Sequence, residues 1–413
     1  QKATVKTTGS IARNIPQVAS ASDALGTAQA FEEASVAYPR IAYDSNSDRI
    51  VVAYQDAGNS SYGTAIVGTV SGTSVTYGTP VVFESASIGA EESIDIVFDS
   101  SNNKVIVFYS ASGGKAKVGT VDNSDNSISF GSAGTFHSGG TSAIDCSFDS
   151  SNNKVVVAFQ DGDASPALGK AAVGTVSGTD ISFGSEVTFE NATIYDVSTT
   201  FDSNSNRVVI AYKDSGNSSH GTAIVGTVSG TSISFGTAVV FNTANTFDTS
   251  CTFDSSNNKV VISYSTGSTG KAIVGTVSNT AISFGTAVTF NNANTNHSRG
   301  AFHSGLNKIV IAYEDDGNSD YGTYIVGTVS GTDISFGSEV VFETAAIQTP
   351  HLAYDSTAQR MVIVYEDDAN SDYGTSIVLN LAGTPEDLTI GQQYFVQTDG
   401  TLGTSADSPS VIA

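Results

Sequence analysis

The chain has 413 residues, a formal net charge of −24 at pH 7 and only 14% charged residues. A negative charge of this size repels nucleic acid and anionic membrane surfaces. No run of about 18 apolar residues offers a membrane-spanning helix. We therefore expect neither nucleic-acid binding nor membrane insertion.

Residues 1–23 are polar and irregular, and we interpret them as a separate N-terminal segment. The segment begins with Gln1 rather than Met and contains no apolar stretch of signal-peptide length. No targeting segment therefore indicates a cellular compartment.

From residue 24 to residue 385 the sequence repeats. Seven copies share an aromatic residue, at Tyr43, Phe98, Phe148, Phe201, Phe253, Phe302 and Tyr354. Asp follows it in six copies and His303 in the other, with a mean period of about 52 residues. This period is in the range of four-stranded propeller blades. The repeat predicts an all-β chain folded as a seven-bladed β-propeller of four-stranded antiparallel blades.

The fourth copy illustrates the expected strands, which are residues 196–201, 207–213, 222–228 and 232–241. The second of these is almost continuously apolar, as expected for a strand buried on both faces. The links DSNSN and SGT have the composition of tight turns. These short links share one face of the predicted ring, and the longer links share the other, which we call the long-loop face.

The two ends of the array predict how the ring closes. Residues 26–31 match the fourth strand of a blade and are followed by a matching loop, whereas the seventh copy lacks its own fourth strand. We expect the N-terminal strand to complete blade seven, which leaves no open edge. The alternative is that residues 387–396, DLTIGQQYFV, complete it.

The long-loop face carries the most varied segments of the array, and loops on a repeated scaffold often bind ligands. Four of its links place an aromatic side chain at one equivalent position: Tyr62, His220, Tyr321 and Tyr373. Such rings could stack on the apolar face of a sugar. The competing interpretation is that they cap the blade core at the base of each loop.

A second candidate site lies three residues before each repeat aromatic. The residues there are Arg40, Asp95, Asp145, Ser198, Ser250, Arg299 and His351. If the first strand of each blade is innermost, they surround the channel mouth and could bind a polar ligand or an ion. Alternatively, they pair with one another and plug the channel.

Two acidic loops are weak candidates for Ca²⁺, through Asp316, Asp320, Asp368 and Asp372. Their spacing departs from an EF-hand, so we favour solvated turns and expect no cofactor or metal. Cys146 and Cys251 occupy equivalent places in the third and fifth copies. Non-adjacent blades hold such positions too far apart for a disulfide, so we predict buried free thiols.

Catalytic motifs are missing from the sequence. Asp95 and Asp145 are the best carboxylate pair for glycoside hydrolysis, but no recognisable acid and nucleophile accompany them. The chain has no Trp, which the Asp-box of sialidases requires, and no G-x-S-x-G, H-E-x-x-H or P-loop motif. We expect a protein that is not an enzyme.

Residues 386–413 differ in kind from the repeats. The words LTIGQQYFVQTDGTL and SPSVIA resemble a segment near the C-termini of bacteriophage tail-fibre and related virion proteins, especially of marine phages. The blade words SNRVVIAY and GTAIVGTVSGTSISFGT resemble repeats of such proteins. In that family the segment usually continues past the position of Ala413. We expect a short C-terminal β appendage here.

The resemblance implies a virion-surface or extracellular location, a role in host recognition or virion structure, and assembly as a homo-oligomer. The long-loop face would then bind a host-surface glycan or another virion protein. Three alternatives stay open: a secreted bacterial lectin-like adhesin, a propeller glycosidase, and a purely architectural virion protein.

Overall fold

The computed structural model describes residues 17–19, 23–89, 92–383, 385–387, 395–396, 402–403 and 411–412. Within these ranges the regular structure consists of β-strands and four short 3-10 turns, namely η1 (Ala57–Asn59), η2 (Ser215–Asn217), η3 (Asp316–Asn318) and η4 (Asp368–Asn370). The strands pair in antiparallel fashion and form repeated four-stranded units. The prediction of an all-β chain of antiparallel units is confirmed. Among the described residues no helix is long and apolar enough to cross a membrane.

Each unit contributes its strands in the same order. The first strands are β8 (Ile94–Asp99), β13 (Thr141–Asp149), β18 (Ile194–Asp202), β23 (Phe247–Asp254), β28 (Thr295–His303), and the second halves of β3 (Gln29–Asp44) and β32 (Val340–Asp355). The second strands are β4 (Arg49–Asp56), β9 (Lys104–Ser110), β14 (Lys154–Asp161), β19 (Arg207–Asp214), β24 (Lys259–Ser265), β29 (Lys308–Asp315) and β33 (Arg360–Asp367). The third strands are β5 (Tyr62–Ser71), β10 (Gly114–Asp122), β15 (Leu168–Ser177), β20 (His220–Ser229), β25 (Gly270–Ser278), β30 (Tyr321–Ser330) and β34 (Tyr373–Asn380).

The fourth strand of each unit is broken into two pieces that both pair with the third strand. These pieces are β6 (Ser74–Tyr77) and β7 (Val81–Ser87), β11 (Ser127–Phe130) and β12 (Gly134–His137), β16 (Asp180–Phe183) and β17 (Val187–Glu190), β21 (Ser232–Phe235) and β22 (Val239–Asn245), β26 (Ala281–Phe284) and β27 (Val288–Asn291), and β31 (Asp333–Phe336) with the first half of β32. The sequence predicted one continuous strand over residues 232–241. The break lies at Gly236, whose Cβ, if it had one, would be 1.9 Å from the carbonyl oxygen of Thr280 in the next unit. Close packing of neighbouring units therefore requires glycine at the break.

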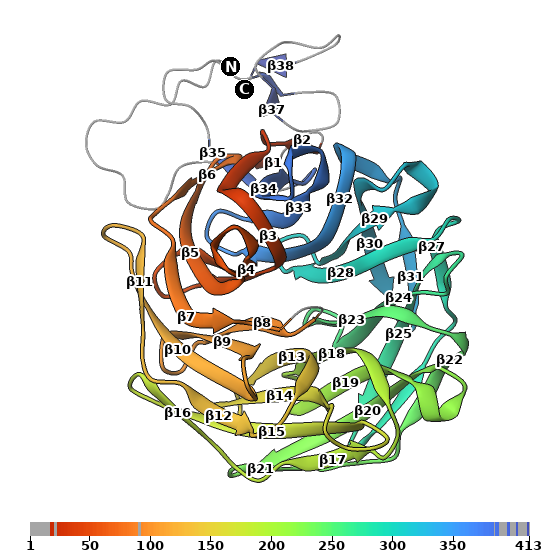
Figure 1. The fold of residues 1–413 in the computed structure, drawn as a ribbon. Helices are drawn as coiled ribbons and strands as arrows, with labels where there is room; N and C mark the ends of the chain where they lie inside the picture. The colour runs from red at the N-terminus through yellow and green to blue at the C-terminus, as the bar shows by residue number, and fades with distance from the viewer. Residues whose placement is uncertain are drawn as a thin grey trace.

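The units surround a common centre, as Figure 1 shows, with β8, β13, β18 and β23 towards the middle and β11, β16 and β21 at the periphery. Each first strand contacts the first strand of the next unit along the chain, in the order β3, β8, β13, β18, β23, β28, β32. Strand β32 in turn contacts β3. The first strands therefore line the centre of the molecule.

The strand that pairs with β34 comes from the N-terminal part of the chain. The pairs are Ala24 with Asn380 and Leu25 with Leu379, in β2 (Ala24–Leu25), and Gln29 with Ser376 at the start of β3. Strand β35 (Pro385–Asp387) pairs instead with β1 (Gln17–Ala19). The β2 and β3 residues therefore occupy the place of a fourth strand beside β34.

The C-terminal segment is described only in part. Strand β36 (Phe395–Val396) pairs with β37 (Leu402–Gly403) and with β38 (Val411–Ile412). Most of the residues that carry the tail-fibre resemblance, and most of the expected N-terminal segment 1–23, lie outside the described residues.

One packing contact recurs in every unit and accounts for the glycine at the start of the third strand. In the fourth unit a Cβ on Gly221 would be 2.4 Å from a ring carbon of Phe241. The same contact joins Gly374 of β34 to Phe31 of β3, where the distance would be 2.3 Å. Phe31 is 6% exposed and packs against Tyr54 of the first unit. The N-terminal strand thus inserts its aromatic ring in the way that every other fourth strand does.

Candidate functional site

An unusual backbone conformation recurs near the start of each first strand. At this place seven residues, none of them glycine, have φ between 46° and 52°: Tyr38, Glu92, Ala143, Asp196, Asp248, His297 and Thr349. Six of them lie five residues before the repeat aromatic, and Glu92 lies six before it. In those six units the pairing of the first and second strands shifts register at this residue. Such residues, which we call the bulge residues, are costly unless the surrounding structure holds them.

Contacts between units hold the bulges. The hydroxyl of Thr249 donates to the carbonyl oxygen of Asp196, and the hydroxyl of Ser298 donates to that of Asp248 at 3.1 Å. The backbone N–H of Ile144 donates to the carbonyl oxygen of Glu92 at 2.6 Å. In these cases the next unit along the chain fixes the bulge carbonyl, so the strained geometry depends on how the units pack.

All seven bulge residues line one cavity of about 640 Å³ at the centre of the molecule, which we call the mouth cavity. Its remaining lining residues are Arg40, Ser142, Tyr195, Arg299, Gln348 and Pro350. Because the bulges begin the first strands, the mouth cavity opens on the long-loop face. Its volume is within the range of about 300–1,000 Å³ that is typical of small-molecule sites.

An ion pair spans the mouth cavity. Arg299 Nη2 of β28 lies 3.2 Å from Glu92 Oε1, just before β8. Around the ring of first strands, β28 and β8 are separated by β32 and β3 on one side and by three strands on the other. The pair therefore ties together distant parts of the ring.

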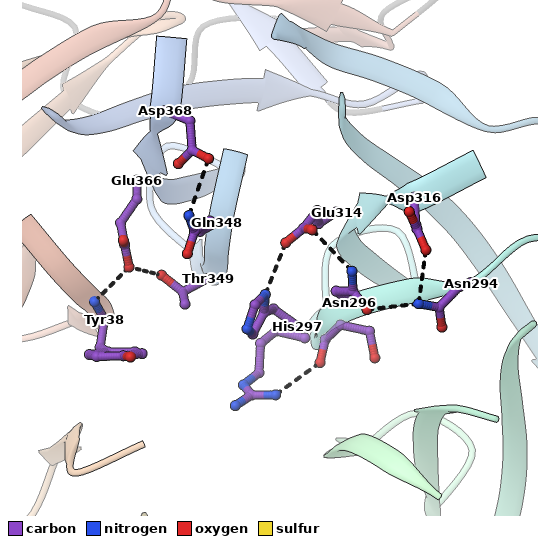
Figure 2. A network of polar contacts seen from close by, with 12 residues as sticks. Tyr38, Asn294, Asn296, His297, Glu314, Asp316, Gln348, Thr349, Glu366 and Asp368 are labelled. Atoms are coloured by element: carbon purple, nitrogen blue, oxygen red, sulfur yellow. Dashed lines mark hydrogen bonds and ion pairs between the residues drawn. The ribbon is translucent and has the colours of Figure 1, made fainter. Parts of the chain in front are cut away.

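A network of hydrogen bonds, drawn in Figure 2, holds several residues that line the cavity. Glu366 Oε1 accepts from the backbone N–H of Tyr38 at 2.8 Å and from the hydroxyl of Thr349. Glu314 contacts His297 Nδ1 at 3.0 Å and accepts from Asn296 at 3.0 Å. Glu314 lies on β29 and Glu366 on β33, so side chains from two second strands hold bulge residues of the first strands.

Ionisable residues of both signs line the mouth cavity. Burial and the nearby carboxylates of Glu92 and Asp248 raise the pKa of Asp196 well above its usual value, although Lys213 and Arg299 oppose them. Burial also raises the pKa of Asp248, against the effect of His297 and Arg299. On the cationic side, burial and the neighbouring Arg299 lower the pKa of Arg40. The carboxylates of Asp95, Glu92 and Asp145 oppose this shift, so the cavity holds buried ionisable groups of both signs that act on one another.

The sequence-predicted channel residues lie mostly deeper than expected. Asp95, Asp145, Ser198, Ser250 and His351 line a second, smaller cavity of about 150 Å³, which we call the deep cavity, together with Arg299 and both cysteines. Of the predicted set, only Arg40 and Arg299 also line the mouth cavity. The mouth is formed instead by the bulge residues, which the sequence prediction did not include.

Apart from Arg299, the predicted channel residues in the deep cavity do not bond to each other but to backbone N–H groups of the next unit. The carboxylate of Asp95 accepts from the backbone N–H of Cys146 at 2.7 Å, and that of Asp145 accepts from the N–H of Thr199 at 2.7 Å. The hydroxyls of Ser198 and Ser250 accept from the N–H groups of Cys251 at 2.9 Å and Gly300 at 3.0 Å, and His351 Nδ1 accepts from that of Ile41 at 3.4 Å. Burial and the nearby Asp95 raise the pKa of Asp145 well above its usual value. These side chains link consecutive units around the channel.

The predicted aromatic residues lie away from both cavities. Tyr62, His220, Tyr321 and Tyr373 each begin a third strand, and each is half-buried. They are not among the lining residues of the mouth cavity or the deep cavity. The structure therefore separates these rings from Arg40 and Arg299, which the sequence prediction had grouped with them on one face.

Among the described residues, no three His, Cys, Asp or Glu side chains converge in a way that could hold a metal ion. The weak Ca²⁺ candidates occupy the turns around η3 and η4, where Asp316 accepts from Asn294 and Asp368 accepts from Gln348. Asp320 and Asp372 follow these turns with positive φ. Cys146 and Cys251 are free and buried, which confirms the prediction for both thiols.

The bulge residues were missed because no strand propensity predicts a left-handed residue inside a strand. A signal was nevertheless present. The position five residues before the repeat aromatic holds Tyr38, Ala143, Asp196, His297 or Thr349 in different copies, whereas the second-strand positions equivalent to residues 208–210 are apolar in every copy.

Comparisons with known proteins bear on the fold. No family model matches the chain, and no curated protein matches it. Among solved structures, the chain is similar to "NanB plus Optactamide", with 12% identity, a TM-score of 0.50, and coverage of 86% of this chain and 70% of that one. It is also similar to Saccharomyces cerevisiae Sqt1, with 11% identity, a TM-score of 0.50, and coverage of 87% and 98%. A third similar structure is the NanB sialidase from Streptococcus pneumoniae in complex with a sulfonate compound, with 11% identity and a TM-score of 0.48.

At such low identity the first two similarities concern the fold alone. Both neighbours are β-propellers, which agrees with four-stranded antiparallel units arranged around a centre. The chain is thus an all-β repeat protein with a β-propeller fold.

Proposed function

We propose that the protein is a non-enzymatic phage tail-fibre or virion-surface protein whose long-loop face binds a host glycan or another virion protein. Its fold would be a seven-bladed propeller closed by the N-terminal strand, at the virion surface. The closure is supported by the pairing of β2 and β3 with β34 and by the contact of β32 with β3.

One observation carries the proposal of binding. Seven strained bulges converge on the mouth cavity and present seven positions there, occupied by six residue types. Strained residues at equivalent positions cluster at ligand sites, because the cost is tolerated where a side chain must be aimed. Support for a non-enzymatic role comes from Asp95 and Asp145, whose carboxylates accept hydrogen bonds from the next unit.

The test is a glycan array probed with the full chain and two variants. Asp248→Tyr places a large side chain in the mouth cavity, and Tyr38 already occupies an equivalent bulge with positive φ. Tyr321→Ala removes a ring outside the cavity and serves as the control. We expect Asp248→Tyr to abolish glycan binding and Tyr321→Ala to retain it.

Loss of binding in Tyr321→Ala but not in Asp248→Tyr would place recognition on the surrounding loops instead. If the wild type binds no glycan, glycan recognition is refuted. A binding assay against proteins from the same virion would then test the other proposed partner. Binding of the full chain, together with loss of binding in Asp248→Tyr, would support another virion protein as that partner. Tail and capsid genes beside the coding sequence are expected, and secretion signals there would contradict the virion assignment.

A further inference from the structure

Charged residues of both signs line the mouth cavity on different first strands. Arg40 lies on β3, whereas Arg299 and His297 lie on β28, which contacts β23. Asp196 and Asp248 lie on β18 and β23, which are the two first strands farthest from β3 in the order of contacts around the ring. A ligand in the cavity would therefore lie between Arg40 and two carboxylates.

Some of these charges already have partners. Arg299 pairs with Glu92 at 3.2 Å, and His297 pairs with Glu314 at 3.0 Å. In the described part of the chain, no ion pair within 4.0 Å involves Arg40, Asp196 or Asp248. The unpaired charges of the cavity are thus one cation and two anions on opposite walls.

Arg40 is the most informative of the three because of its burial. Its side chain lines the cavity although the residue is only 5% exposed, and its Nη1 donates to the carbonyl oxygen of Pro39 at 3.1 Å. Burial and Arg299 lower the pKa of Arg40, whereas Asp95, Glu92 and Asp145 raise it. A guanidinium has five N–H donors, and in the described part of the chain no carboxylate forms an ion pair with Arg40 within 4.0 Å. A carboxylate brought by a ligand would offer Arg40 the bidentate partner that its geometry favours.

Asp196 and Asp248, which form the anionic wall of the cavity, likewise have no ion-pair partner within 4.0 Å in the described part of the chain. Lys213 lies on the same side, but its ammonium sits 3.9 Å above the ring of Phe247 rather than in an ion pair with Asp196. Burial is the largest cause of the raised pKa values of Asp196 and Asp248, and Arg299 opposes the shift at both residues from beyond ion-pair distance. An ammonium group from a ligand would supply a positive charge within ion-pair distance.

The remaining lining residues suit a sugar ring. Tyr195 is 49% exposed at the cavity, and Tyr38 lines it on the opposite side. Aromatic side chains pack their apolar faces against the apolar face of a pyranose. Ser142, Gln348 and Thr349 add hydroxyl and amide groups, which can hydrogen-bond to sugar hydroxyls.

We propose that the mouth cavity binds a sugar residue that carries both a carboxylate and a free ammonium group, with the carboxylate on Arg40 and the ammonium on Asp196 and Asp248. This inference rests on the proposed glycan-binding function and specifies its ligand class. Arg40, Asp196 and Asp248 line the same cavity of about 640 Å³, so the proposal places both charges on one sugar residue.

The experiment compares four matched sugars by calorimetric titration of the full chain at pH 7.5 and low salt. Muramic acid carries both charges, N-acetylmuramic acid only the carboxylate, glucosamine only the ammonium, and N-acetylglucosamine neither. We expect muramic acid to bind at least ten-fold more tightly than each of the other three. β-Alanine carries both charges without a sugar ring, and we expect it to bind at least ten-fold more weakly than muramic acid.

Two variants assign the charges to residues. Asp196→Asn should reduce the affinity for muramic acid to that for N-acetylmuramic acid, and should leave binding of N-acetylmuramic acid unchanged. Arg40→Gln should abolish the preference for muramic acid over glucosamine. Because Arg40 is buried, its variant is interpreted only if its thermal unfolding resembles that of the wild type. Asp333→Asn makes the same exchange at an exposed position outside both cavities, so it is the matched control and should bind like the wild type.

Equal affinities for the four sugars would overturn the inference, as would a preference for muramic acid that survives in Asp196→Asn. Binding of β-alanine as tight as that of muramic acid would refute the sugar part. Glycan-array binding that is lost in Asp248→Tyr, without any preference for muramic acid, would refute the inference and leave the proposed function standing. If no glycan binds at all, both are refuted.

Discussion

Replacing Phe31 by Ala tests whether the N-terminal strand closes the ring in solution. Phe31 is 6% exposed, and its ring centroid lies 5.3 Å from that of Tyr54 and 5.9 Å from that of Tyr77. Its ring also covers Gly374, where a side chain would clash. Truncating a buried Phe typically costs about 3–5 kcal/mol, from lost transfer free energy and the cavity left behind. We expect Phe31→Ala to lower the free energy of unfolding by this amount.

Phe189 provides the matched control inside the array. It is 8% exposed, with ring centroids 5.3 Å from Tyr212 and 5.7 Å from Phe235, so its environment closely resembles that of Phe31. Urea unfolding of the full chain, followed by tyrosine fluorescence and circular dichroism, should give both variants similar losses. A change below about 0.5 kcal/mol for Phe31→Ala, alongside a large loss for Phe189→Ala, would refute closure by the N-terminal strand.

Three further predictions concern packing, thiol reactivity and pH. Gly221→Ala should lower the free energy of unfolding by about 1–3 kcal/mol, because its Cβ would meet the ring of Phe241; unchanged thermal unfolding would contradict this contact. Cys146 and Cys251 are buried, and burial raises their thiol pKa values, so a thiol reagent at pH 8 should label them only after urea is added. Rapid labelling of the native protein would show that the deep cavity is open. Burial lowers the pKa of His303 to about 4, so the stability that it contributes above its unfolded pKa of about 6.5 is lost as pH falls towards 4. His303→Asn should flatten this acid-side decline in the urea midpoint, and parallel pH profiles would argue against it.

Much of the fold could be predicted because the same pattern of strands and turns occurs in seven copies of the repeat. The second strand of the fourth copy was expected over residues 207–213 and is β19, Arg207–Asp214. The turn after the first strand forms as its composition predicts, with the carboxylate of Asp202 accepting from the N–H groups of Asn204 and Ser205. Residues close together in the sequence determine both the second strand and the turn before it, so both could be predicted from one sequence.

The break in the fourth strand escaped prediction because its cause is not local. Gly236 is required by a carbonyl oxygen of the next unit, about 44 residues along the chain, and nothing in the sequence of one copy reveals that contact. The candidate site was likewise predicted only in part. The pattern three residues before the aromatic placed Arg40 and Arg299 correctly at the mouth cavity, but Asp95, Asp145 and His351 lie in the deep cavity.

The mouth cavity is lined by the bulge residues and not by most of the predicted residues, because the bulges change the direction in which the first strands present their side chains. A regular strand would alternate its side chains between two faces, and period-2 reasoning assumes this throughout. The bulge adds a left-handed residue, so that Asp196, Asp248 and His297 turn towards the centre at a level that alternation does not predict. Contact of the predicted rim aromatics Tyr62 and Tyr321 with a ligand stays a prediction, which the Tyr321→Ala variant tests for Tyr321 on the glycan array.

The recurrence of one backbone bend with different side chains has a consequence for how such a surface can diversify. At Asp196, Asp248 and Glu92 the bulge carbonyl accepts a hydrogen bond from the neighbouring unit, a contact that does not involve the bulge residue's own side chain. Exchanging one of the seven side chains therefore alters what the mouth cavity recognises without rebuilding the framework that presents it. The seven bulge positions can therefore change their side chains separately, and a new binding specificity can arise one substitution at a time.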